Sequence, residues 1–214
     1  MANSSERKQT LVGWAYNNAG FFLNIQLQKF LFFYECFSKI DGDTYELSGL
    51  KGYRNGPVFS AVWGDARYDA NFKDSCTEMF ALRADTINER RAKLSGFLVR
   101  ILGNKLSEFT HRLNIWAAKR LEIDRGASQV PLNEEDFSEH DTTVFRDIER
   151  SYTEEYIDSV DMRNINGKVF VFLKSDENQL TDSIMEELNE ASYDSEFDSP
   201  VYISFSETGK LLLD

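Results

Sequence analysis

The sequence predicts a mainly α-helical domain over residues 1–152 and a small C-terminal α+β extension over residues 153–214. In the first part, apolar residues recur at spacings of three and four, which is the period of one face of an α-helix. Near residue 160 the pattern changes to short runs of β-branched and aromatic residues, which are typical of strands. A chain of 214 residues, 42% of them hydrophobic, is long enough for a helical core with such an addition.

The first domain is organised around a predicted core helix that starts at Asn24, whose side chain is a suitable N-cap. Asp41-Gly42-Asp43 supplies the stop. Apolar residues follow the helical spacing and several more lie off the main stripe, so we expect burial on more than one side. The stripe consists of Leu27, Phe30, Leu31, Tyr34 and Phe37, and the additional apolar residues are Phe32, Phe33 and Cys36.

Other helices are expected on both sides of the core helix. They are predicted at residues 5–18, 57–63, 74–84, 86–102, 107–121 and 133–152. Ser107 is the expected N-cap of the fifth of these helices. In the fourth, Arg90, Arg91 and Lys93 are expected to point outward.

Turn chemistry interrupts the helical pattern after the core helix. A short extended segment is predicted at 45–50. Asn55-Gly56-Pro57 indicates a turn in which Gly56 adopts a positive φ. Pro57 suits the first turn of a helix, which is why we expect a helix to begin there.

The extension is predicted to have a β-α-β-β arrangement. Its first strand, 168–173, follows an Asn166-Gly167 turn. The acidic helix at 182–191 and two further strands at 200–205 and 210–213 complete it.

Charge is unevenly distributed along the chain, whose net charge is −12. Residues 1–132 carry 18 Lys and Arg against 14 Asp and Glu, a net +4, whereas residues 133–214 carry 6 against 22, a net −16. An acidic half disfavours nucleic acid, because affinity for phosphate backbones depends on Lys and Arg. Two interpretations remain open: the acids keep the protein soluble, or they face a basic partner.

The two cysteines, Cys36 and Cys76, match no metal-binding spacing and indicate reduced thiols in a cytoplasmic protein. The first residues contain no apolar signal-peptide core. No run approaches the ~18 apolar residues that a membrane span requires. We therefore expect neither secretion nor contact with a membrane.

Catalytic motifs are not found in the sequence. The two histidines, His111 and His140, lie beside no Ser or Cys in a nucleophile context, and phosphate loops and metalloprotease motifs do not occur. We expect no enzyme, no cofactor and no metal. Lys29 is the one basic residue on the apolar stretch of the core helix, and it has two interpretations: a side chain that snorkels at the edge of the core, or a contact with a partner.

Three short segments follow one another across the first domain. They are Leu27-Gln28-Lys29-Phe30-Leu31-Phe32-Phe33, then Tyr53-Arg54-Asn55-Gly56-Pro57-Val58, then Leu106-Ser107-Glu108-Phe109-Thr110-His111 followed by Trp116. On these segments the chain, over roughly residues 8–150, resembles the Panacea domain family, a phage- and plasmid-associated family that includes SocA-like proteins and promiscuous antitoxins. Two departures from the family pattern are Ile115, where proline is usual, and Phe59-Ser60, where smaller residues are usual. The acidic extension lies outside that pattern.

The resemblance implies a mostly helical binding domain without catalysis, which neutralises a cognate toxin by direct protein–protein binding. The toxin would be encoded by the adjacent gene, and the acidic half favours a basic one. The alternative function is a protease adaptor that delivers a toxin for degradation. The candidate partner-binding residues are Lys29, Tyr53, Gly56, Pro57, His111 and Trp116. A purely structural role is the alternative for each of them.

Overall fold

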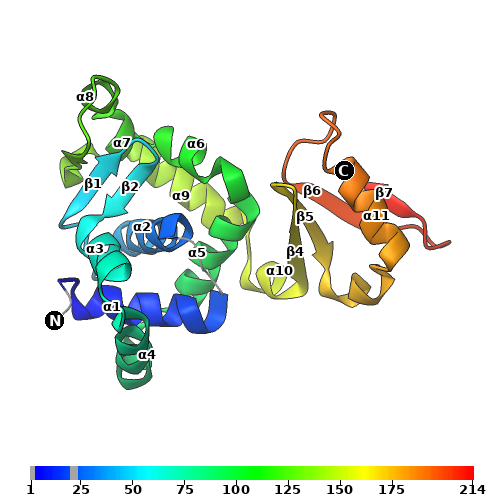
Figure 1. Cartoon of the computed structure of the whole chain (residues 1–214), viewed down its shortest axis with the longest axis horizontal. Coiled ribbons are helices and arrows are strands. Elements are labelled where there is room, and N and C mark those ends of the chain that lie inside the picture. The colour runs from blue at the N-terminus through cyan, green and yellow to red at the C-terminus, as the bar shows by residue number, and fades with distance from the viewer. Residues whose placement is uncertain (1–2, 20–23) are drawn as a thin grey trace.

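The computed structural model describes residues 3–19 and 24–214 and places helix α2 (Asn24–Ile40) at the centre of a helical unit (Figure 1). Every residue of α2 from Leu27 to Ser38 is buried. A helix that is apolar around most of its circumference must be covered on all sides, and this confirms the prediction of a core helix. The helix ends at Ile40, directly before the predicted stop at Asp41-Gly42-Asp43.

The other helices of this unit come from both sides of α2 in the sequence. They are α1 (Glu6–Trp14), α3 (Ser60–Tyr68), α4 (Phe72–Arg83), α5 (Glu89–Leu102), α6 (Leu106–His111), α7 (Asn114–Ala117), α8 (Arg120–Asp124) and α9 (Glu139–Ser151). Phe145 of α9 shows how they pack, because its ring lies 6.4, 6.2 and 5.1 Å from those of Phe32, Phe33 and Phe37. The residues off the main stripe of α2 thus meet a second helix, as the sequence predicts.

A small antiparallel sheet covers one end of α2 in the order β2-β1-β3. Its strands are β1 (Leu50–Tyr53), β2 (Gly56–Phe59) and β3 (Val130–Pro131). The predicted helix start at Pro57 is wrong, because Pro57 and Val58 lie in β2 and α3 begins only at Ser60. Gly56 has the predicted positive φ, 101°, and this turns the chain back onto β1. The predicted extended segment at 45–50 overlaps β1 only at Leu50.

Two predicted helix starts are also shifted. Ser107 does not cap α6; it lies within the helix, and its hydroxyl donates to the Asn55 carbonyl instead. Helix α9 starts at Glu139, after a 3-10 turn at Glu134–Asp136, because Ser138 and Asp141 form a capping box there.

Arg91 is buried, contrary to the prediction that it points outward. Its guanidinium pairs with Asp41 at 2.9 Å and Asp43 at 3.2 Å, the acids that follow α2. It also lies over the Tyr34 ring, 5.4 Å from the centroid. An arginine can be buried when its charge is paired in this way, so Arg91 ties α5 to the end of the core helix.

The C-terminal extension is a four-stranded sheet covered on one face by a helix (Figure 1). Its elements are α10 (Glu154–Ser159), β4 (Val160–Ile165), β5 (Lys168–Leu173), α11 (Asp182–Ala191), β6 (Val201–Phe205) and β7 (Leu211–Leu213). The order across the sheet is β4-β5-β6-β7, with β5 and β6 parallel. The predicted β-α-β-β arrangement therefore missed one strand, β4, because the sequence of β4 is largely polar and does not show a strand pattern.

Strand β5 joins the two parts of the molecule because both of its faces are buried. Val169 and Val171 belong to the same apolar cluster as α2 and α5, whereas Phe170 and Phe172 pack in a second cluster beneath α11. Successive side chains of a strand point to opposite faces. The extension is thus built around one strand that contacts both cores.

Candidate functional site

The turn between β1 and β2 brings together the three segments that the sequence singled out. From α2, the Lys29 ammonium donates to the carbonyl oxygens of Asn55, at 2.8 Å, and Pro57, at 3.1 Å. From α7, the Trp116 indole donates to the Tyr53 carbonyl at 3.0 Å. Residues that are far apart in the sequence therefore fix one turn of four residues.

The outer edge of β2 is closed by two adjacent side chains of α2. Gln28 accepts a hydrogen bond from the Phe59 amide at 2.8 Å, and Lys29 donates to the Pro57 carbonyl. Because backbone groups alternate in direction along an antiparallel strand, these groups point away from β1. Pro57 fits this edge, since its missing N–H would also point outward. The Gln28-Lys29 pair of α2 and the Gly56-Pro57 pair of the hairpin thus belong to the same contact between helix and strand.

Helix α6 closes the turn from the opposite side. The Ser107 hydroxyl donates to the Asn55 carbonyl at 3.1 Å. The His111 ring stacks on Trp116, with centroids 3.8 Å apart and planes inclined by 15°. A Cβ on Gly56 would lie 2.4 Å from the Lys29 amine and 2.5 Å from the Thr110 hydroxyl, so only glycine fits between these two helices.

The Lys29 side chain is 1% exposed and its ammonium does not reach water, so the snorkelling interpretation is wrong. Among residues 3–19 and 24–214, no carboxylate pairs with it. Burial lowers the pKa of Lys29 from its usual 10.5 to about 7. The two carbonyl acceptors are what make a buried amine tolerable here.

His111 lies partly buried next to this amine. Burial lowers its pKa, and the nearby charges of Lys29 and Arg120 act in the same direction. In the described part of the chain its Nε2 atom is buried without a hydrogen-bond partner. The ring is therefore held neutral against Trp116, which is the environment of a packing residue.

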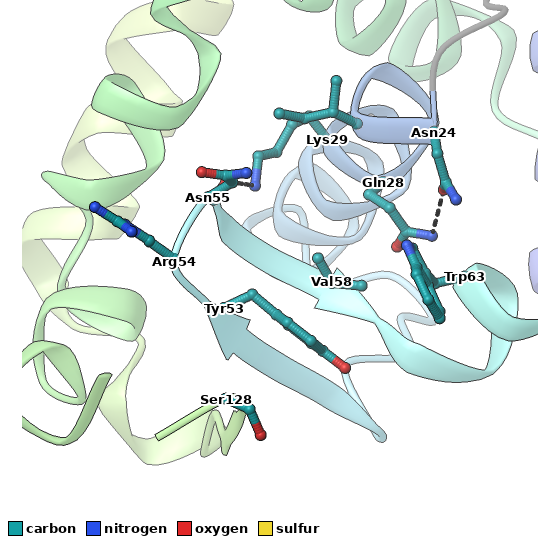
Figure 2. A pocket seen from close by; sticks show the side chains of 10 residues that line it. Asn24, Gln28, Lys29, Tyr53, Arg54, Asn55, Val58, Trp63 and Ser128 are labelled. Carbon is teal, nitrogen blue, oxygen red and sulfur yellow. Dashed lines mark hydrogen bonds between the residues drawn. The ribbon is translucent and has the colours of Figure 1, made fainter. Parts of the chain in front are cut away.

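An open cleft of about 290 Å³ lies beside the turn, between the start of α2, the hairpin and α3 (Figure 2). It is lined by Asn24, Ile25, Gln28, Lys29, Tyr53, Arg54, Asn55, Val58, Trp63 and Ser128. Figure 2 shows that the lining side chains come from α2 (Asn24, Gln28), from the hairpin strands (Tyr53, Val58) and from α3 (Trp63). The lining is mixed: three amide side chains, two basic side chains and Ser128 lie beside aliphatic and aromatic side chains.

Exposed apolar side chains stand at the mouth of this cleft. Ile25 and Trp63 are each 37% exposed. On the same helix as Trp63, the Arg67 guanidinium lies 5.5 Å from the Trp63 ring centroid and 5.7 Å from that of Tyr68, which is largely exposed. Trp, Tyr and Arg are the residue types that contribute most to binding energy in protein interfaces.

The structure brings all six candidate partner-binding residues into this one region, but at different depths. Lys29, Gly56, Pro57 and Trp116 are buried, whereas Tyr53 and His111 are partly exposed. The buried four contribute by fixing the hairpin. Sequence reasoning missed Ile25, Arg54 and Trp63 as surface residues of the cleft, because their spacing matches that of buried helix or turn positions.

Other kinds of site are not evident in the described ranges. Within 3–19 and 24–214, no cluster of three His, Cys, Asp or Glu could hold a metal ion. Cys36 and Cys76 are both free and buried. In the same residues, none of the helices has the length and apolar character needed to cross a bilayer.

Comparisons with known proteins gave no match: no protein-family model, no curated protein and no solved structure is significantly similar to this chain.

Proposed function

We propose that this protein is a non-enzymatic antitoxin, similar to the Panacea domain family, that neutralises a cognate toxin by direct protein–protein binding. The observation that carries the proposal is the open cleft, at which Ile25 and Trp63 are exposed beside a hairpin fixed by the three family-like segments. Large apolar side chains at a preformed cleft are typical of protein-binding surfaces.

The way the hairpin is held supports binding by a rigid surface. Side chains from α2, α6 and α7 all hydrogen-bond to the turn. A surface that is ordered before binding loses less conformational entropy when the partner arrives. The buried candidate residues, Lys29 above all, would thus act on the partner through the shape of the hairpin, and Tyr53 would touch it directly.

The proposed partner is a basic toxin encoded by the adjacent gene. The net −16 of residues 133–214 supports a basic partner, because opposite charges raise the association rate and the specificity of binding. We place the protein in the cytoplasm, where Cys36 and Cys76 would stay reduced. Nucleic acid and membranes are not proposed as partners.

Co-expression with the product of the adjacent gene tests the proposal. We expect that product to be toxic alone and harmless beside this protein. Replacing Trp63 by Ala should weaken neutralisation at least tenfold in the amount of antitoxin required, as expected for the loss of an interface hot spot of ~2 kcal/mol. The matched control is Leu82→Ala, which removes a side chain that is 79% exposed on α4. An adjacent product that is harmless alone, or toxic beside this protein, contradicts the proposal.

The amount of toxin in the same cells separates the two binding functions. A steady toxin level with lost activity supports blocking by contact, whereas disappearance of the toxin supports the adaptor that delivers it to a protease. His111→Gln tests an enzyme reading of the site. We expect this variant to neutralise the toxin as well as the original chain does, because neutralisation by contact requires no proton transfer at this side chain.

A further inference from the structure

The outer edge of β7 is a sheet edge with unpaired backbone groups. Tyr202 and Asp214 exchange two backbone hydrogen bonds, and the Ser206 amide donates to the Lys210 carbonyl. Because such pairs alternate along an antiparallel ladder, the amides and carbonyls of Leu211 and Leu213 point away from β6. Figure 1 shows β7 at the side of the sheet farthest from β4, and in the described residues no strand pairs with its outer edge.

Side chains protect two other edge strands, β2 and β4, and β7 differs from them. The edge of β2 is closed by Gln28 and Lys29. Strand β4 carries charged side chains, of which Asp161 pairs with Arg100 and Arg163 pairs with Glu177. Charge on an edge strand is a common device against unwanted pairing. Strand β7 is Leu-Leu-Leu, with no charge within it.

An apolar surface lies beside this edge. Leu212 is paired with Ser204, so its side chain shares a sheet face with Tyr202, two residues away on β6. Leu212 is 44% exposed and Tyr202 is 38% exposed. A strand added to β7 would therefore find exposed apolar side chains next to the open backbone groups.

The charge around β7 indicates what kind of strand could be added. Residues 160–214 contain four Lys or Arg and twelve Asp or Glu, a net charge of −8. Next to the strand, Glu207 lies in the turn before β7, Lys210 precedes β7 directly and Asp214 follows it, which sums to a net −1. A second copy of this chain would bring the same negative charge to the edge, and like charges at an interface repel. We propose that the outer edge of β7 receives an extended, Lys- or Arg-bearing segment of a partner protein as an additional strand.

This inference rests on the proposed function only in taking the partner to be a protein. It adds a second contact surface, on the extension, to the cleft on the helical unit. In this proposal, main-chain hydrogen bonds to Leu211 and Leu213 hold the added strand. The acidic residues of the extension select a strand that carries Lys or Arg.

A labelled peptide of alternating Lys and Val, titrated into the full chain, tests the inference without any toxin. We expect binding that weakens with added salt, because exposed charges are screened within about 10 Å at ~0.1 M ionic strength. Amide hydrogen exchange at Leu211 and Leu213 should slow when the peptide binds. Leu212→Arg should weaken peptide binding about tenfold or more, whereas Leu82→Arg, with an exposed position on α4, should leave it unchanged.

Several results would overturn it: no binding of the Lys-Val peptide, equal binding of a Glu-Val peptide, unchanged exchange at Leu211 and Leu213, or self-association of the chain that Leu212→Arg abolishes. Since no toxin is present, these results are independent of the antitoxin test. A chain that fails to neutralise any toxin yet binds the peptide at β7 refutes only the proposed function.

Discussion

In the folded protein the Lys29 amine is hydrogen-bonded to two backbone carbonyls instead of water, and this makes the stability of the protein depend on pH. Its pKa is about 7 in the folded protein, against 10.5 ordinarily. Between these values the unfolded chain keeps a proton that the folded chain lacks, so raising the pH favours the folded state, by up to about 1.4 kcal/mol per pH unit. Below the folded pKa both states are charged, the folded state carries the full desolvation penalty, and this contribution to the slope vanishes.

We therefore predict that Lys29→Met removes a rise in unfolding free energy between about pH 7 and about pH 9. Urea unfolding of the two proteins at several pH values measures it. Lys73→Met, which removes an exposed amine, should keep the rise. An unchanged slope in Lys29→Met would show that the amine is not the group responsible.

Gly56 is a second position of this site at which we expect substitution to be costly. Both Gly56 and Gly49 have positive φ, 101° and 74°, so alanine is strained at either position by about 1–2 kcal/mol. At Gly49 an added Cβ meets nothing within 4 Å, whereas at Gly56 it overlaps Lys29 and Thr110. We predict that Gly56→Ala lowers the unfolding free energy by ~2 kcal/mol more than Gly49→Ala does. Equal losses in chemical denaturation would mean that the helices move aside.

At the scale of elements, one buried carboxylate fixes the start of two helices. Asp141 accepts hydrogen bonds from the amides of Asn114, at 2.6 Å, and Ile115, at 3.0 Å, and from the Ser138 amide in the capping box of α9. A proline at 115, as in the family pattern, could not donate this bond. The Ile115 amide is thus paired with Asp141, a relation that no spacing in the sequence reveals.

We predict that Asp141→Ala destabilises the protein by about 3 kcal/mol, because the buried Ile115 amide and the amides of Asn114 and Ser138 lose their acceptor. Glu139→Ala, in the same first turn but exposed, should cost less than ~1 kcal/mol. Thermal and urea unfolding compare the two variants. If both lose the same stability, the carboxylate contributes only through the helix dipole.

The elements that the sequence predicted well are those with a strong local pattern. Strand 168–173 and helix 182–191 have the predicted bounds, and the core helix begins at Asn24 and ends directly before its stop residues. The failures have tertiary causes. Pro57 lies in a strand because Gln28 and Lys29 hydrogen-bond to the outer edge of that strand. Helix α9 starts late because Asp141, which forms its capping box with Ser138, also accepts from the Ile115 amide of α7.

The same distinction holds for the candidate site. The sequence identified the three segments that meet at the hairpin, but not how deeply their residues are buried. The apolar spacing around Lys29 indicates a buried position, whereas the charge of Lys29 indicates a position at the edge of the core. Only the positions of the Asn55 and Pro57 carbonyls resolve this conflict. Trp63 shows the opposite error, since an aromatic residue in an apolar helix pattern stands at the mouth of an open cleft.

For the whole molecule, the question is whether the unit at 1–152 and the extension at 153–214 unfold separately. Rings cross the proposed boundary: Tyr156 lies 6.1 Å from Phe97 of α5 and 6.0 Å from Tyr152. Val160, Val169 and Val171 of the extension belong to the larger apolar cluster. Deleting 157–214 would therefore expose part of that cluster, which makes point substitutions a better test of the extension than truncation.

Val171 and Val201 form a matched pair for this question. Both are buried in the extension, but Val171 packs in the cluster shared with the helical unit and Val201 in the cluster beneath α11. Because β5 carries both clusters on its two faces, we predict one cooperative transition. Each valine-to-alanine change should lower the unfolding free energy by about 2 kcal/mol. All three tryptophans, Trp14, Trp63 and Trp116, lie in the helical unit, so their fluorescence reports its unfolding alone. A fluorescence midpoint that shifts with Val171→Ala but not with Val201→Ala would show that the extension unfolds first, as an independent unit.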